Sequence, residues 1–146
     1  MKKYSLSDYI LSFTSNDSII DNIFGSVSIG GEGSYLGSIT IGGLPNLWDT
    51  TSFATGGWVH NKNLSRTGTV NITLNQLSDA VAKFIQLCNT YYTGDFDGLT
   101  LSLTDRNGQL VAECIDCYIQ KIPDQSFNES SSDQTWTFTS GKISFL

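Results

Sequence analysis

Three groups of residues in this sequence could do chemistry: two closely spaced cysteines, one histidine and a short aspartate pair. Cys114 and Cys117 have the spacing of half a zinc site, but only Cys88 and His60 remain as further sulfur or nitrogen ligands. Both cysteines also fall on a predicted strand, where a separation of three places them on opposite faces. We therefore interpret them as packed thiols, not as a metal or redox site.

The other two groups also predict no reaction. His60 is the sole histidine, and the surrounding WVHNKN offers no carboxylate or nucleophile for acid–base work. Asp95 and Asp97 precede Gly98 as in a calcium loop, but LTLSL follows where further oxygen ligands and a glutamate are needed. No serine lies in a Gly-x-Ser-x-Gly motif. The sequence thus predicts no enzymatic activity, no cofactor and no metal site.

An aromatic stretch is the strongest candidate for a binding function. Trp48, Phe53 and Trp58 lie in residues 42–64, a long segment with glycines at both ends. Three interpretations remain open: a core strand, a sugar-binding platform or a protein–protein contact. If the segment is exposed, an interface is the better explanation, because exposed aromatic clusters mark contact surfaces.

Length and composition limit the function classes. The 146 residues predict one domain spanning 1–146, with enough apolar sequence for a core. A formal net charge of −6 argues against binding to a phosphate backbone, which requires lysine and arginine. An odd number of cysteines, three, without a convincing signal peptide indicates reduced thiols in a cytoplasm. No apolar run is long enough to span a membrane.

The clearest local structure is a strand followed closely by a helix. Val70, Ile72 and Leu74 alternate with polar residues, which predicts a half-buried strand. Ser78 is a suitable N-cap and Gly94 a suitable end for a helix over about residues 78–92. An apolar stripe at helical spacing marks the buried face of that helix: Val81, Phe84, Ile85 and Cys88.

The rest of the chain reads as short strands and turns. A hairpin is predicted across Asn107-Gly108, and another across the glycine-rich residues 30–33, joining strands at 26–29 and 35–41. Residues 14–22 are predicted to be a turn-rich break, and Ser140-Gly141 to separate two terminal strands. Seven to nine strands and one helix predict an antiparallel β-sandwich or barrel, with the helix on its side or across an open end.

Residues 68–87, GTVNITLNQLSDAVAKFIQL, resemble the tail tube proteins of contractile-tailed phages and phage-tail-like particles. The likeness extends to the hairpin LTLSLTDRNGQLVAECIDCYIQKIP at 99–123 and to the terminal strand around Trp136 and Phe138. It implies a tail-tube-like β-barrel subunit that forms hexameric rings stacked into a hollow tube. Its partners would be other copies of itself together with sheath, baseplate or tail-tip and tape-measure proteins.

The resemblance also implies where the protein acts and how its surfaces are used. It implies a virion tail or phage-like particle, assembled in the bacterial host cytoplasm, that conducts DNA or delivers an effector or ion path through the bacterial envelope. In a virus, DNA would pass through the lumen without specific binding. We expect acidic groups to face the lumen, and residues 14–34 or 42–64 to reach the adjacent ring. The alternatives are a type VI secretion-type hexameric ring protein and a carbohydrate-binding β-sandwich that uses Trp48, Trp58 and the Tyr91-Tyr92 pair.

Overall fold

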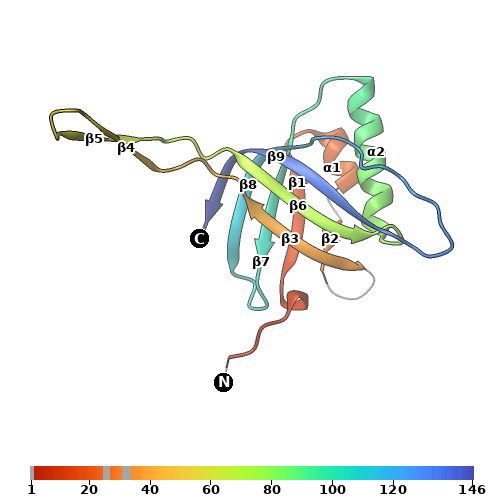
Figure 1. Ribbon diagram of the computed structural model, residues 1–146. Helices are drawn as coiled ribbons and strands as arrows, with labels where there is room; N and C mark the ends of the chain where they lie inside the picture. Colours follow the sequence, from red (N-terminus) through yellow and green to blue (C-terminus); the bar gives the residue numbers. More distant parts are fainter. Residues whose placement is uncertain (1, 25–26, 31–33) are drawn as a thin grey trace.

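The computed structural model describes residues 2–24, 27–30 and 34–146. In this part of the chain seven strands form one antiparallel sheet, in the order β2-β1-β7-β8-β9-β6-β3, which curls into a nearly closed barrel (Figure 1). The bounds are β1 Ile10–Ser15, β2 Ser28–Ile29, β3 Leu36–Gly42, β6 Gly68–Asn75, β7 Leu99–Thr104, β8 Leu110–Ile119 and β9 Asp133–Phe145. The predicted mainly β, antiparallel fold is confirmed.

A separate hairpin projects from the barrel. Its strands, β4 (Trp48–Ser52) and β5 (Trp58–Lys62), pair only with each other in a two-stranded sheet. Figure 1 shows the hairpin extending away from the barrel on the side opposite helix α2 (Asp79–Thr93). The long segment between β3 and β6 is therefore regular structure, but it does not belong to the barrel.

Helix α2 has the ends that its sequence predicts. Ser78 is the N-cap, and its hydroxyl accepts a hydrogen bond from the backbone N–H of Ala80 at 3.4 Å. Gly94 is the C-cap. The predicted stripe faces the core: Val81, Phe84 and Cys88 are buried, and Ile85 packs against the core from a half-buried position.

The core lies between the curved sheet and the helices. Phe84 of α2 is fully buried, and its ring centroid lies 5.3 Å from that of Trp136 and 5.4 Å from that of Phe138, both on β9. Phe13 of β1 packs edge-on against Phe84 at 5.7 Å. Val70, Ile72 and Leu74 of β6, which alternate with polar residues, are buried in the same core. Aromatic pairs in this geometry add to the hydrophobic gain of burial.

The predicted break at residues 14–22 is wrong in part, because it contains helix α1 (Ser18–Phe24). The carboxylate of Asp17 accepts a hydrogen bond from the N–H of Ile19 at 3.0 Å, and so caps this helix. Ile20 is buried in the core. Seven residues are too few for a helical apolar period to stand out in the sequence.

The predicted hairpin across residues 30–33 is also wrong. Ser28 and Ile29 of β2 pair with Ser12 and Leu11 of β1, whereas β3 pairs with β6. The two strands thus lie at opposite edges of the sheet. Residues 26 and 31–33 of this prediction lie outside the described part of the chain. Glycines signal a turn, but the pairing partner of each strand is decided by closure of the barrel.

Two predictions about the C-terminal half have different outcomes. The hairpin of β7 and β8 is confirmed: Gly108, with φ +77°, closes the turn, and the Asp105 carboxylate accepts from the backbone N–H groups of Asn107 and Gln109. The expected break at Ser140-Gly141 is wrong, because β9 runs unbroken from Asp133 to Phe145. β9 pairs with β8 on one side and with β6 on the other, and this pairing keeps the backbone extended at Gly141.

Candidate functional site

The cysteine pair is buried on one side of β8, not on two. Cys114 and Cys117 are both in the core, which contradicts the predicted opposite faces. The register between β7 and β8 shifts between Leu99 and Leu101, so that β8 carries one extra residue there. Asp116, with φ +57°, lies in this β-bulge. Because a bulge resets the alternation, residues three apart point to the same side.

Burial makes these thiols poor nucleophiles. It raises the pKa of Cys114 to about 12 and that of Cys117 to about 11, the second partly offset by a hydrogen bond with Ser140. Burial also raises the pKa of Cys88. Since the thiolate is the reactive form and the metal ligand, the three side chains act as apolar packing at neutral pH. Among the described residues, no three His, Cys, Asp or Glu side chains are grouped to hold a metal ion.

Within the part of the chain that the structure describes, the contacts of His60 and of the loop that holds Asp95 and Asp97 stabilise local structure and form no reactive group. The Nδ1 atom of His60 lies 2.9 Å from the Thr50 hydroxyl across the β4–β5 hairpin. Asp97 uses its backbone carbonyl, which accepts a hydrogen bond from the Tyr91 hydroxyl at 2.7 Å. Asp95 lies in the same loop after α2, as the interpretation of this segment as a polar loop predicts.

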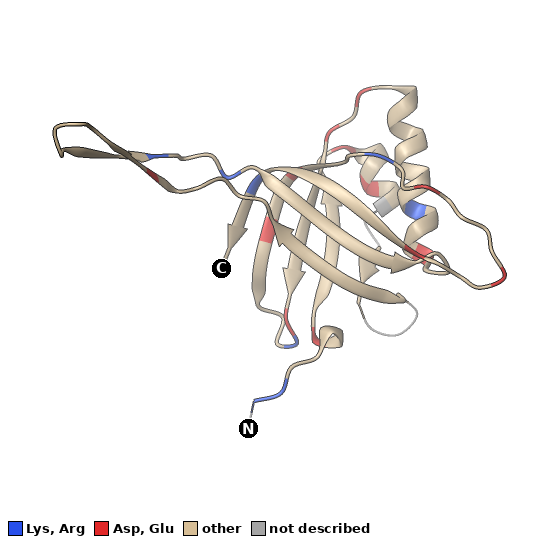
Figure 2. Cartoon of the chain, in the orientation of Figure 1, with Lys and Arg blue, Asp and Glu red and all other residues tan. Residues whose placement is uncertain are grey.

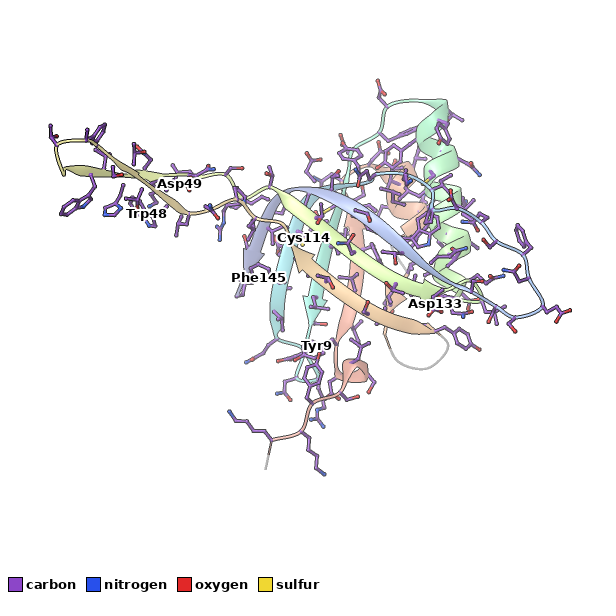
Figure 3. All side chains as sticks on the ribbon, viewed as in Figure 1. Tyr9, Trp48, Asp49, Cys114, Asp133 and Phe145 are labelled. Atoms are coloured by element: carbon purple, nitrogen blue, oxygen red, sulfur yellow. The ribbon has the colours of Figure 1, made fainter. Side chains whose placement is uncertain are left out.

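The β4–β5 hairpin exposes the three aromatic residues singled out in the sequence. Trp48, Phe53 and Trp58 are 54%, 53% and 66% exposed, so the core interpretation of these side chains is wrong. All ten residues of the two strands are exposed. Figure 3 shows Trp48 and Asp49 on the hairpin, clear of the barrel. Exposed aromatic side chains at this density are typical of a binding surface.

Register divides the hairpin into two different faces. Trp48 pairs with Lys62, Thr50 with His60 and Ser52 with Trp58, so these six residues share one side, here named the tryptophan face. The Lys62 ammonium lies 5.6 Å from the centre of the Trp48 ring, a cation–π distance. Asp49, Thr51, Val59 and Asn61 form the opposite face. The large aromatic side chains of the paired strands are therefore on one side of the hairpin.

A second surface is the outward side of strands β3, β6 and β9. Side-chain hydrogen bonds join neighbouring strands: Thr73 and Thr135 hydroxyls lie 3.1 Å apart, and Thr137 donates to the Asn71 amide oxygen at 2.7 Å. The paired positions define what is here named the hydroxyl face: Ser38, Thr40, Thr69, Asn71, Thr73, Asn75, Asp133, Thr135, Thr137 and Thr139. Asp133 is the one charged member of this set. Figure 2 shows these strands almost free of charge.

The sequence did not single out a cavity at the C-terminal end of α2. It has a volume of about 520 Å³ and is lined from α2, the following loop and the end of β8 by aromatic and apolar side chains, together with Asp95, Gln120 and Lys121. Tyr91, Phe96 and Tyr118 come together there from positions up to 27 residues apart. The adjacent Tyr91-Tyr92 pair was visible in the sequence, but nothing local showed that Tyr118 would meet it.

The barrel, the projecting hairpin and the long helix define a fold class that occurs in contractile injection systems. A sheath/tube terminator of the PVC extracellular contractile injection system is similar over 100% of this chain and 98% of its own, with TM-score 0.65 and 12% identity. A chain of the PVC sheath-tube complex is similar over 99% of this chain and 93% of its own, with TM-score 0.61 and 11% identity. The anti-feeding prophage cap is similar over 100% and 93%, with TM-score 0.57 and 11% identity.

The amino-acid sequence identifies the protein family. Residues 9–146 match the Bacteriophage PhiTE tail tube protein family, and the chain belongs to this family. No curated protein sequence matches the chain. The family is structural and not enzymatic, and its members are components of a phage tail or phage-like particle. Within residues 2–24, 27–30 and 34–146, the helices lack the length and continuous apolar sequence that a membrane-spanning helix needs.

Proposed function

We propose that this protein forms hexameric rings that stack into a hollow tail tube, through which DNA or an effector passes into a bacterial cell. Family membership supports the tube. The observation that carries the assembly is the β4–β5 hairpin, whose strands form a separate sheet and leave Trp48, Phe53 and Trp58 more than half exposed. Apolar rings held in water favour a protein surface that can cover them.

Ring closure has a natural site at the sheet edge. Strand β3 (Leu36–Gly42) pairs with β6 on one side and is the last strand of the sheet. An edge strand presents unpaired backbone N–H and C=O groups that another chain can pair with. We infer that β3 joins the sheet of a neighbouring subunit, so that the inner strands of six copies close one continuous barrel around the lumen.

The hydroxyl face is our candidate for the lumen wall. It lies on the side of β6 and β9 opposite α2, and its threonine and asparagine side chains suit a water-filled channel. Such a wall is close to neutral, which counts against the expectation of an acidic lumen. Nucleic acid would then slide because the ten residues of the hydroxyl face include no lysine or arginine that could bind its phosphates, not because carboxylates repel them.

Partners follow from the same proposal. The solved structures with this fold include a PVC sheath-tube complex and a sheath/tube terminator. We propose that this chain likewise contacts a sheath around the tube, and also baseplate or tail-tip and tape-measure proteins at its end. Acting as a particle component, it would be assembled in the host cytoplasm.

Electron microscopy of the purified protein tests the proposal. Negatively stained samples across a concentration series should contain rings or tubes with a central hole. A protein that stays monomeric and featureless at high concentration would contradict it. The exposed tryptophans would then favour the carbohydrate-binding alternative, which a glycan screen addresses, because aromatic faces stack on sugar rings.

A further inference from the structure

The cavity beside α2 is a preformed aromatic site. It is separate from both the β4–β5 hairpin and the hydroxyl face. Its walls include Cys88, Tyr91, Phe96, Tyr118, Ile119 and Ile122. Cavities of about 300–1,000 Å³ lined mainly by apolar and aromatic side chains are the usual binding sites for compact apolar groups. The volume of about 520 Å³ falls within that range.

Contacts within the chain hold the walls of the cavity in place. The Tyr91 ring lies 5.6 Å from that of Tyr118 and 6.2 Å from that of Phe96. The hydroxyl of Tyr91 donates to the Asp97 carbonyl, and that of Tyr118 donates to the Phe96 carbonyl at 3.4 Å. A site fixed in this way loses little conformational entropy when a partner binds.

The same chain carries a group of matching chemistry on its other side. The hairpin with Trp48 and Trp58 leaves the barrel on the side away from α2, so it does not reach its own cavity (Figure 1). A projecting apolar element and a complementary cavity at different places on one chain make a heterologous contact between copies. Repeated contacts of that kind build rings or helical stacks.

Charge supports this pairing. Burial first, then the Tyr118 hydroxyl and the negative charges of Asp17, Asp97 and Asp116, raise the pKa of Tyr91, so these three carboxylates lie near this wall of the cavity. Asp95 lines the cavity, against one cation, Lys121. In residues 44–66 the balance is reversed, with Asp49 against Lys62 and Arg66. A cationic hairpin base thus meets an acidic rim, which favours the docked orientation.

We propose that the tryptophan face of one subunit's hairpin docks in the α2 cavity of a second copy of this chain. This inference rests on the proposed tube assembly and adds the receiving site to it. Trp58 or Trp48 fills the cavity among Tyr91, Phe96 and Tyr118. Lys62 then lies near the acidic rim around Asp95.

Disulfide trapping in assembled protein tests the docking. Ser52 lies on the tryptophan face and Gln120 is exposed at the cavity, so Ser52→Cys with Gln120→Cys leaves both tryptophans and the cavity rings intact. The matched control is Asn61→Cys with Gln120→Cys, because Asn61 is on the opposite hairpin face. The three native cysteines are buried, and each single variant measures their background.

We expect mild oxidation of tubes to give a ladder of covalent dimers, trimers and larger species with the first pair, at least tenfold more than with the control pair. Tubes that form without a ladder, or with equal ladders for both pairs, would overturn the docking and leave the tube proposal standing. Failure of the unsubstituted protein to form rings or tubes at any concentration would overturn the proposed function and the docking with it.

Discussion

The β4–β5 hairpin and the unit formed by β6 and α2 use similar side chains in opposite ways. Both place large apolar groups on one face of regular structure. Phe84 of α2 is fully buried between Phe13, Trp136 and Phe138. Trp58 of β5 is 66% exposed. The first region stabilises the fold of the subunit, whereas the large side chains of the second stay mostly exposed in the described part of the chain.

This difference shows which interactions hold each region. An isolated two-stranded hairpin is marginally stable in water. The hairpin has cross-strand contacts between Thr50 and His60, between Asn61 and Thr51, and between Lys62 and Trp48, all of them exposed. Such exposed pairs each contribute about 0.2–1 kcal/mol. Its tryptophans lie outside the barrel core, and in the proposed assembly a partner subunit supplies the surface that covers them.

The largest effect is expected in the core. Phe84→Ala removes the ring that contacts three other aromatic side chains, and should lower the free energy of unfolding by about 3–5 kcal/mol. Chemical denaturation of the monomer followed by tryptophan fluorescence measures this. Phe84→Leu is the control that keeps most of the apolar volume and should lose much less. Equal losses would mean that the ring is not packed as described.

The next effect should appear in assembly and not in folding. Trp58→Ala should leave the unfolding free energy of the monomer within about 0.5 kcal/mol, because the ring is mostly exposed. The concentration needed for assembly should rise about 30-fold, as expected for loss of about 2 kcal/mol at an aromatic hot spot. Sedimentation across a dilution series measures it. Phe127→Ala, at a side chain 85% exposed outside the hairpin, should change neither quantity.

A smaller effect is expected at the start of α2. Ser78→Ala removes the hydroxyl that accepts from the Ala80 N–H, and should lower the unfolding free energy by about 1 kcal/mol. Ser78→Asn should restore most of the loss, since asparagine caps helices well. Thermal melting of the three proteins gives the comparison. Assembly per folded subunit should stay unchanged, because this site belongs to the folding region.

The smallest effect concerns the bulge that turns Cys114 and Cys117 to one side. Asp116 has φ +57°, which alanine adopts at a cost and glycine adopts freely. Asp116→Ala should therefore be about 0.5–1 kcal/mol less stable than Asp116→Gly, while both lose the carboxylate equally. Denaturation midpoints measure the difference. An alanine variant as stable as the glycine variant would contradict the assigned backbone conformation.

Local signals explain what the sequence predicted well. The alternation of Val70, Ile72 and Leu74, the Ser78 cap and the Gly94 stop all act within a few residues, and the structure has each of them. The turn at Asp105 to Gly108 is equally local. Each of these features depends on neighbours in the chain, so a single sequence contains most of the information.

Contacts between residues far apart in the sequence explain most of the predictions that were wrong. β2 and β3 lie at opposite sheet edges because closure of the barrel, not the glycine-rich turn, selects their partners. The bulge at Asp116 reversed the alternation that predicted opposite faces for Cys114 and Cys117. Tyr118 reaches Tyr91 only through the packing of β8 against α2. The aromatic content of residues 42–64 is unusual for a loop, but composition does not separate a buried strand from a projecting one.

The most direct test of the central claim is to shorten the hairpin. Replacing residues 47–63 by a short Gly-Ser turn removes every strand residue of β4 and β5 and no strand of the barrel. The account predicts a monomer with the melting temperature of the unmodified protein to within a few degrees and no tubes in electron micrographs. A melting temperature that falls by ten degrees or more, or tubes that form normally, would contradict the claim that this hairpin serves assembly and not folding.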